Sequence, residues 1–242
     1  MKLIVYLLFS ILCISVQAQI LQDNFSDGNF TTNPIWTGDA ADFIINSSLQ
    51  LQSDNLGVSS SSELSTVAAI QDSTIWEFYV QMDFAPSTSN YALVYLQSDN
   101  ANLSNTSNGY YLRIGSSGST DSIEIYRLDA GVSTKVFGGA VGAVATNPTV
   151  RCRIIRNNIG FWEVFVDYSG GINYALEGSF TDANYSNGSY FGFKATYTTT
   201  RGDKFFFDDV SISPLVVDVI PPSIDSVAVL TATSIDLYFD EP

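Results

Sequence analysis

The chain has 242 residues, of which 25 are Asp or Glu and 10 are Lys or Arg, and it contains no histidine. Nucleic acid and anionic lipid are bound through patches of Lys and Arg, so a formal charge of −15 argues against both as partners. Without histidine, Ser-His-Asp and Cys-His catalysis are excluded, and the commonest ligand of zinc and copper is missing.

The N-terminal segment, residues 1–18, has the pattern of a secretory signal peptide. Lys2 gives a positive start, Leu3 to Ile14 form an apolar run, and Val16-Gln17-Ala18 offers small residues for cleavage before Gln19. The apolar run is too short to span a membrane. We therefore expect a secreted or cell-surface protein, with no membrane insertion of the mature chain.

Apolar and polar residues alternate with a period of two from Phe43 to Ile212, which predicts β-strands. In the clearest run, one face carries Trp76, Phe78, Val80, Met82 and Phe84. Further strands are expected at Tyr91–Gln97, Tyr110–Ile114, Ser122–Leu128, Thr134–Phe137, Thr149–Arg156, Phe161–Tyr168, Tyr174–Phe180, Tyr190–Tyr197 and Lys204–Ile212. Short turns between so many strands predict an antiparallel β-sandwich or jelly roll.

Two smaller features complete this region. The polar run Ser59–Ser62 is predicted to be an exposed loop. Cys152 is the only thiol left after removal of the signal peptide, so no internal disulfide can form. Alternation places Cys152 on the same face as Val150 and Ile154, and we expect it to be buried.

The pattern breaks at Pro214 and again at Pro221-Pro222, after which Ile224–Leu230 and Ser234–Phe239 are predicted to be two strands. Some twenty residues cannot bury a core of their own. The expected organisation is a sandwich at 19–214, a linker at 215–222, and at 223–242 the first strands of a domain that continues beyond Pro242.

Three stretches resemble a known family. Asp23-Asn24-Phe25-Ser26-Asp27-Gly28-Asn29-Phe30, with Trp36 following, is similar to the opening strand of concanavalin A-like (laminin-G-like) jelly rolls of exported bacterial proteins. Phe161–Asp167 resembles a late strand of that family, and Lys204–Val210, with Phe-Asp-Asp-Val, resembles its closing strand. The resemblance implies the fold of residues 20–213 and leaves the activity open, because sandwiches host many functions.

The C-terminal segment resembles a second family. Pro221–Asp225 and Ile235–Pro242 are similar to the first hairpin of Ig-like domains in bacterial S-layer and other surface proteins, although Asp240 stands where serine is usual. The resemblance implies a multidomain protein at the cell surface, with further domains of the same chain after Pro242.

A glycoside hydrolase needs two carboxylates about 5–10 Å apart. On one strand Asp121 and Glu124 would point to opposite faces, while Glu163 and Asp167 share a face about 13 Å apart. We therefore expect no catalytic residue and no enzyme, with a diverged glycosidase as the least favoured alternative.

Calcium is the one cofactor that the sequence suggests. The first and last strands of a jelly roll commonly lie side by side, which would bring Asp23 or Asp27 near Asp208 or Asp209. A hard cation takes six to eight oxygen ligands, chiefly carboxylate and carbonyl. The alternative is that these acids are solvated strand ends.

Tyrosines recur on the strand faces opposite the expected core. A tyrosine offers a sugar both an apolar ring and a hydroxyl group. The predicted carbohydrate-binding residues are Tyr79, Gln81, Tyr95, Gln97, Tyr111 and Arg113. The alternative is ordinary cross-strand aromatic pairing on a solvated sheet.

The sequence thus favours a non-catalytic extracellular module that binds a glycan or polysaccharide, or that mediates adhesion. A structural spacer that binds no ligand remains the alternative. A sheet face that displays several tyrosines with Gln97 or Arg113 would favour the binding module.

Overall fold

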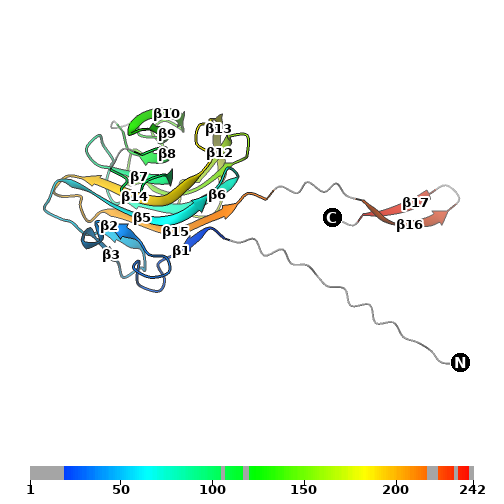
Figure 1. Ribbon diagram of the computed structural model, residues 1–242, viewed down its shortest axis with the longest axis horizontal. Coiled ribbons are helices and arrows are strands. Elements are labelled where there is room, and N and C mark those ends of the chain that lie inside the picture. The colour runs from blue at the N-terminus through cyan, green and yellow to red at the C-terminus, as the bar shows by residue number, and fades with distance from the viewer. Residues whose placement is uncertain (1–18, 105–106, 117–119, 217–222, 232–233, 240–242) are drawn as a thin grey trace, which may run out of the picture.

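The computed structural model describes residues 19–104, 107–116, 120–216, 223–231 and 234–239 (Figure 1). The expected signal peptide at 1–18 and most of the expected linker lie outside these ranges. Two antiparallel β-sheets stack face to face, and a separate two-stranded hairpin follows them in the chain. Among the described residues, no helix is long and apolar enough to cross a membrane.

The first sheet, called sheet A, has the strand order β13-β12-β11-β6-β15-β4-β3, and β1 also pairs with β15. Its strands are β1 (Leu21–Asp23), β3 (Phe43–Ile45), β4 (Leu51–Ser53), β6 (Thr74–Met82), β11 (Thr149–Arg156), β12 (Phe161–Asp167), β13 (Ala175–Thr181) and β15 (Phe205–Pro214). The pairing of β1 with β15 places the first and last strands of the sandwich side by side, as expected.

The second sheet, called sheet B, has the order β10-β9-β8-β7-β14-β5-β2. Its strands are β2 (Thr37–Gly38), β5 (Ser60–Ile70), β7 (Tyr91–Ser98), β8 (Gly109–Ile114), β9 (Ile123–Asp129), β10 (Val132–Gly138) and β14 (Gly188–Tyr197). A short 3-10 helix, η1 (Ala40–Asp42), precedes β3. The hairpin consists of β16 (Ile224–Thr231) and β17 (Ser234–Phe239), and its apolar side chains, such as Val227 and Leu237, are exposed.

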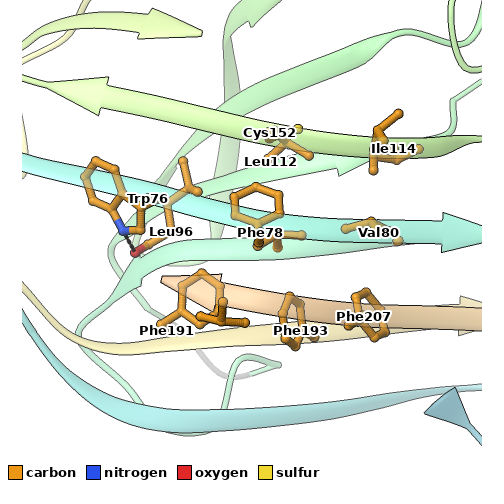
Figure 2. Packing of buried hydrophobic residues seen from close by; sticks show 14 of the residues in the cluster. Trp76, Phe78, Val80, Leu96, Leu112, Ile114, Cys152, Phe191, Phe193 and Phe207 are labelled. Carbon is orange, nitrogen blue, oxygen red and sulfur yellow. Dashed lines mark hydrogen bonds between the residues drawn. The ribbon is translucent and has the colours of Figure 1, made fainter. Parts of the chain in front are cut away.

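The core lies between the two sheets, where the inner faces meet (Figure 2). Trp76 of β6 stacks on Trp162 of β12, with ring centroids 5.5 Å apart, and its indole N–H donates to the Leu96 carbonyl of sheet B at 2.7 Å. Such inward alternation from both sheets is what holds a sandwich together. Figure 2 also places Cys152 in this core, which confirms its expected burial.

The predicted strands and the all-β sandwich are confirmed, but the loop predicted at Ser59–Ser62 is wrong. Ser60–Ser62 begin β5 and pair with the end of β14. Ser62 is fully buried, and its hydroxyl lies 2.5 Å from both the Asp42 carboxylate and the Tyr197 hydroxyl. A polar run can therefore form a strand here because its hydroxyl groups have partners.

Trp162 connects three strands or segments of the core, because its ring contacts Trp76, Phe180 and Tyr110. Alternation along its own strand does not predict these contacts. We expect Trp162→Ala to lower the free energy of unfolding by about 3–5 kcal/mol, through lost burial and the cavity left behind. Urea denaturation measures this change. The control is Ile159→Ala, since Ile159 is 70 % exposed; equal effects of the two variants would contradict this description of the core.

Candidate functional site

Three tyrosines form a row across the outer face of sheet B. Tyr95 of β7 is directly opposite Tyr111 of β8, and Tyr111 is directly opposite Tyr126 of β9. The ring centroids lie 5.4 Å apart for the first pair and 5.2 Å for the second, which is stacked at 10°. Cross-strand register therefore builds an aromatic row from residues that are far apart in the sequence.

A loop segment after β7 covers one end of this row. Leu103 is buried against Tyr95, and its carbonyl accepts a hydrogen bond from the Tyr95 hydroxyl at 3.0 Å. Gly192 of β14 makes room for it, because a Cβ there would lie 2.7 Å from the Leu103 side chain and 2.5 Å from the Leu64 carbonyl. Tyr95 is therefore a supporting residue, with only 5 % of its surface exposed.

A groove of about 610 Å³ lies beside the row. It is lined by Tyr91, Leu93, Tyr95, Leu103, Ser104, Tyr111, Arg113, Tyr126, Leu128, Ala130, Gly131, Val132, Ser133 and Lys194. The walls come from the loop at Leu103–Ser104 and from the β9–β10 turn at Ala130–Gly131. A polar groove with aromatic walls is suited to a ligand that has both apolar and hydroxyl surfaces.

Arg113 is held in place at this groove. Its Nε donates to the Gly115 carbonyl at 2.6 Å, and its guanidinium carbon lies 4.1 Å from the centre of the Tyr91 ring. A cation over an aromatic face is attracted by the electrons of the ring. Within the part of the chain that the structure describes, neither the terminal guanidinium nitrogens of Arg113 nor the Tyr91 hydroxyl has a hydrogen-bond partner.

Lys194 and Glu63 fix another part of the wall. Lys194 Nζ lies 3.3 Å from a Glu63 carboxylate oxygen and donates to the Ser104 hydroxyl at 2.5 Å. The Ser104 amide donates to Glu63 at 3.1 Å, so the loop is tied to β5. These contacts place Ser104 at the groove.

Burial raises the pKa of the tyrosine hydroxyl groups in the row further above physiological pH. It raises the pKa of Tyr95 and Tyr111 above the ordinary value. Burial, followed by the hydrogen bond to Glu124, raises the pKa of Tyr126 to about 12. These groups are therefore neutral hydrogen-bond donors at any physiological pH.

The structure brings together three of the six predicted carbohydrate-binding residues, namely Tyr95, Tyr111 and Arg113. Tyr79 and Gln81 lie on β6 of sheet A, away from this groove, and the Tyr79 hydroxyl donates to Gln81 at 2.6 Å. The sequence left open which of the six share one surface, because alternation shows which face of a strand is outward but not which sheet the strand joins.

Gln97 is displaced by a bulge that the sequence does not reveal. The register between β7 and β8 shifts between Tyr95 and Gln97. Gln97 is buried, and its side-chain amide donates to the carbonyl oxygens of Tyr185 and Asn187. A bulge of this kind takes a residue out of the row that alternation predicts.

Sequence reasoning missed Leu103, Ser104 and Ser133 as groove residues. Leu103 and Ser104 lie in a loop that has no periodic pattern, and Ser133 is the second residue of β10. The Ser133 hydroxyl accepts a hydrogen bond from Tyr111 at 2.9 Å. No local signal in the sequence marks these residues, since they reach the groove through the path of the loop and the register of sheet B.

Two of the predicted calcium ligands have other roles. Asp23 is buried and accepts hydrogen bonds from the Phe25 amide at 2.8 Å and from the Trp36 indole N–H at 2.8 Å. Asp27 accepts from the amide and the side chain of Asn29. Both acids stabilise the segment that follows β1.

The other two predicted ligands lie at a bulge in β15. Asp209 has a φ of 50° and forms an ion pair with Arg151, while Asp208 accepts a hydrogen bond from the Asp209 amide. Among the described residues, no group of three or more acidic, His or Cys side chains could hold a metal ion. The four acids therefore do not fit the oxygen cluster that calcium requires.

Three of the four carboxylates weighed for glycoside hydrolysis have other partners. Asp121 is buried and accepts from the Ser116 amide, and Glu124 contacts Tyr126 and Lys135. Asp167 accepts from Ser169 and Asn173 in the turn after β12. None of the described residues that line the groove is Asp or Glu.

Comparison with known proteins identifies this architecture. The VIP36 exoplasmic/lumenal domain in its Ca²⁺/Man2-bound form matches with a TM-score of 0.57 and 13 % identity, covering 84 % of this chain and 90 % of that one. The fold is that of a legume-lectin-like β-sandwich. The legume lectin-like domain from Entamoeba histolytica matches with a TM-score of 0.56 and 13 % identity, over 82 % of this chain and 97 % of its own.

A third similar structure is the carbohydrate binding module CBM66 from Bacillus subtilis, with a TM-score of 0.51 and 14 % identity, covering 74 % of this chain and 94 % of that one. The expected concanavalin A-like sandwich is thus confirmed at the level of fold. No family model matches the sequence, and the search of curated proteins gave no match.

The carboxyl group of Asp208, at the bulge in β15, allows a test of how burial affects the stability of this region. Burial raises the pKa of this carboxyl group to about 6, against an ordinary value of 3.8. The folded state therefore holds the proton more tightly than the unfolded state, and the stability of the protein falls as the pH rises from about 4 to 6.

We expect Asp208→Asn to be more stable than the parent by about 1 kcal/mol at about pH 8, after allowing for partial solvent screening, and equal to it at about pH 4. Urea denaturation at the two pH values measures the difference. A variant less stable than the parent at the higher pH would contradict the assigned cost of ionising this group.

Proposed function

We propose that this protein is a non-catalytic extracellular module that binds carbohydrate through the groove on the outer face of sheet B. The observation that carries the proposal is the groove itself, in which a row of tyrosines, Arg113 and loop hydroxyl groups meet. Aromatic surface together with fixed polar groups is the usual composition of a small-molecule site.

The named ligands of similar folds support this proposal. VIP36 is described in Man2-bound and Man3GlcNAc-bound forms, and CBM66 is described as a carbohydrate binding module. Because these proteins are only 13–14 % identical to this chain, no binding residue can be transferred from them. The proposed site therefore rests on the groove of this protein alone.

The groove would hold a sugar mainly through hydrogen bonds. Tyr111 lies between Tyr95 and Tyr126, so it presents little ring face and is only 6 % exposed. Tyr91 and Tyr126 are more accessible. A sugar would pack against their rings and receive hydrogen bonds from Tyr91 and Arg113.

The two alternatives are weaker. Because no described carboxylate lines the groove, it lacks the acid pair of a glycosidase. A spacer without a ligand would leave unexplained why Arg113 is fixed beside a groove with its terminal nitrogens unpartnered.

The wider organisation is part of the proposal. Residues 19–214 would form the binding domain, and 223–242 the first strands of an Ig-like domain in a longer secreted or cell-surface chain. The exposed apolar side chains of β16 and β17 support this, because a further domain would cover them.

A glycan and polysaccharide array with the purified protein tests the function directly. For the best-retained glycan, we expect Tyr91→Ala to weaken binding by about tenfold, because it removes a hydroxyl donor and the ring under Arg113. Isothermal titration calorimetry measures the affinity.

Tyr174→Ala is the matched control. Tyr174 also lies under an arginine, with Arg153 at 4.4 Å from its ring centre, but it belongs to the sheet A side of the sandwich. A loss on Tyr174→Ala and none on Tyr91→Ala would move the site to sheet A. A blank array would favour the spacer.

Whether binding and stability depend on calcium is tested separately. The groove has no described carboxylate to hold a cation, so we expect glycan retention and the melting temperature to be the same in calcium and in excess EDTA. Loss of retention in EDTA would restore the alternative of a calcium-dependent site at Asp23, Asp27, Asp208 or Asp209.

A further inference from the structure

The charges around the groove differ from those of the protein as a whole. The chain carries 25 acidic and 10 basic residues. The described lining of the groove nevertheless contains two cations, Arg113 and Lys194, and no carboxylate. The only charged side chains among the described residues that line this groove of an acidic protein are therefore cations.

Lys194 is already neutralised by Glu63, which lies 3.3 Å away. Arg113 differs, because it forms no ion pair with a described carboxylate. Its direct cross-strand neighbour is Glu124, but the two oxygens of that acid accept from Lys135 at 3.0 Å and from Tyr126 at 2.7 Å.

The other two arginines without an ion pair among the described residues do not face this groove. Arg156 is buried and donates to the Asp72 carbonyl, and Arg201 lies over the Phe84 ring. Beside the groove, Lys135 is paired with Glu124, and Lys194, which lines it, is paired with Glu63, so Arg113 is the cation of the described lining that has no carboxylate partner.

The free groups at this point can all donate a hydrogen bond. Arg113 keeps the N–H groups of its two terminal nitrogens, and the nearby Tyr91 hydroxyl is also available. A planar guanidinium matches the two oxygens of a carboxylate, and such charge-assisted hydrogen bonds are stronger than those to a neutral hydroxyl. The Gly115 carbonyl and the Tyr91 ring hold the group in one orientation, which reduces the entropy lost on binding.

We propose that the groove selects an acidic sugar, a uronate residue whose carboxylate binds the terminal nitrogens of Arg113 beside the Tyr91 hydroxyl. This inference rests on the proposed carbohydrate-binding function. The net charge of the protein makes such binding selective, because a chain of charge −15 repels a polyanion everywhere except where a cation is placed to receive it.

The test compares polygalacturonate with its fully methyl-esterified form, which has the same backbone but no charge, by affinity electrophoresis and calorimetry. We expect the acid to bind at least about tenfold more tightly than the ester. Dextran sulfate is the control for general attraction to polyanions, and we expect it to bind more weakly than polygalacturonate.

Arg113→Gln should bring the affinities for the acid and the ester to within about twofold of each other, since it removes the charge but keeps an amide donor. Arg201→Gln is the matched control, because Arg201 also lies over an aromatic ring without an ion pair and does not line the groove. It should leave the preference intact. Circular dichroism and the melting temperature verify that both variants are folded.

The outcomes separate this inference from the proposed function. Glycan binding that is sensitive to Tyr91→Ala, without preference for the acid, would overturn the selectivity and leave the binding function standing. Equal binding of dextran sulfate and polygalacturonate, or a preference unchanged in folded Arg113→Gln, would also overturn it. Failure to bind any charged or neutral glycan would overturn both proposals.

Discussion

The register between β7, β8 and β9 is the constraint on which the proposed site depends. It places Tyr95, Tyr111 and Tyr126 in one row and sets Arg113 next to Tyr91. A slip of one residue would turn this whole set toward the core. The inward residues of the same strands, among them Leu112 and Ile125, pack in the core and so hold the register. Core packing on one face of sheet B thereby determines the chemistry available on the other.

The same sheet shows how an acidic protein can keep a positive site. Most cations near the groove are paired with carboxylates, as Lys194 is with Glu63 and Lys135 with Glu124. Arg113 is held instead by a carbonyl group and an aromatic ring, contacts that fix its position and leave its charge unneutralised. The groove thus has one unpaired positive charge, at Arg113, which favours selective recognition of a ligand over general adhesion.

Much of the fold could be predicted from the sequence, because alternation is a local signal. The inward face of β6, from Trp76 to Met82, is buried as the pattern indicates. The site was predicted only in part, because assignment of strands to sheets is non-local. Tyr79 and Tyr95 carry the same outward signal, yet they belong to opposite sheets. The bulge before Gln97 and the loop that carries Leu103 produce no periodic pattern in the sequence. The hydrogen-bond partners that allow the Ser62 hydroxyl to be buried are distant in the sequence and come close only in the folded chain.

The central claim is that ligand binds on the outer face of sheet B, and NMR titration of the isotope-labelled protein with the best-retained oligosaccharide tests it most directly. Our account predicts that the largest amide shift changes fall on Tyr91, Tyr111 to Arg113 and the β9–β10 turn, with little change on β6 and β11. Shift changes concentrated around Glu77, Arg151 and Tyr174, where sheet A has a hollow of its own, would contradict it.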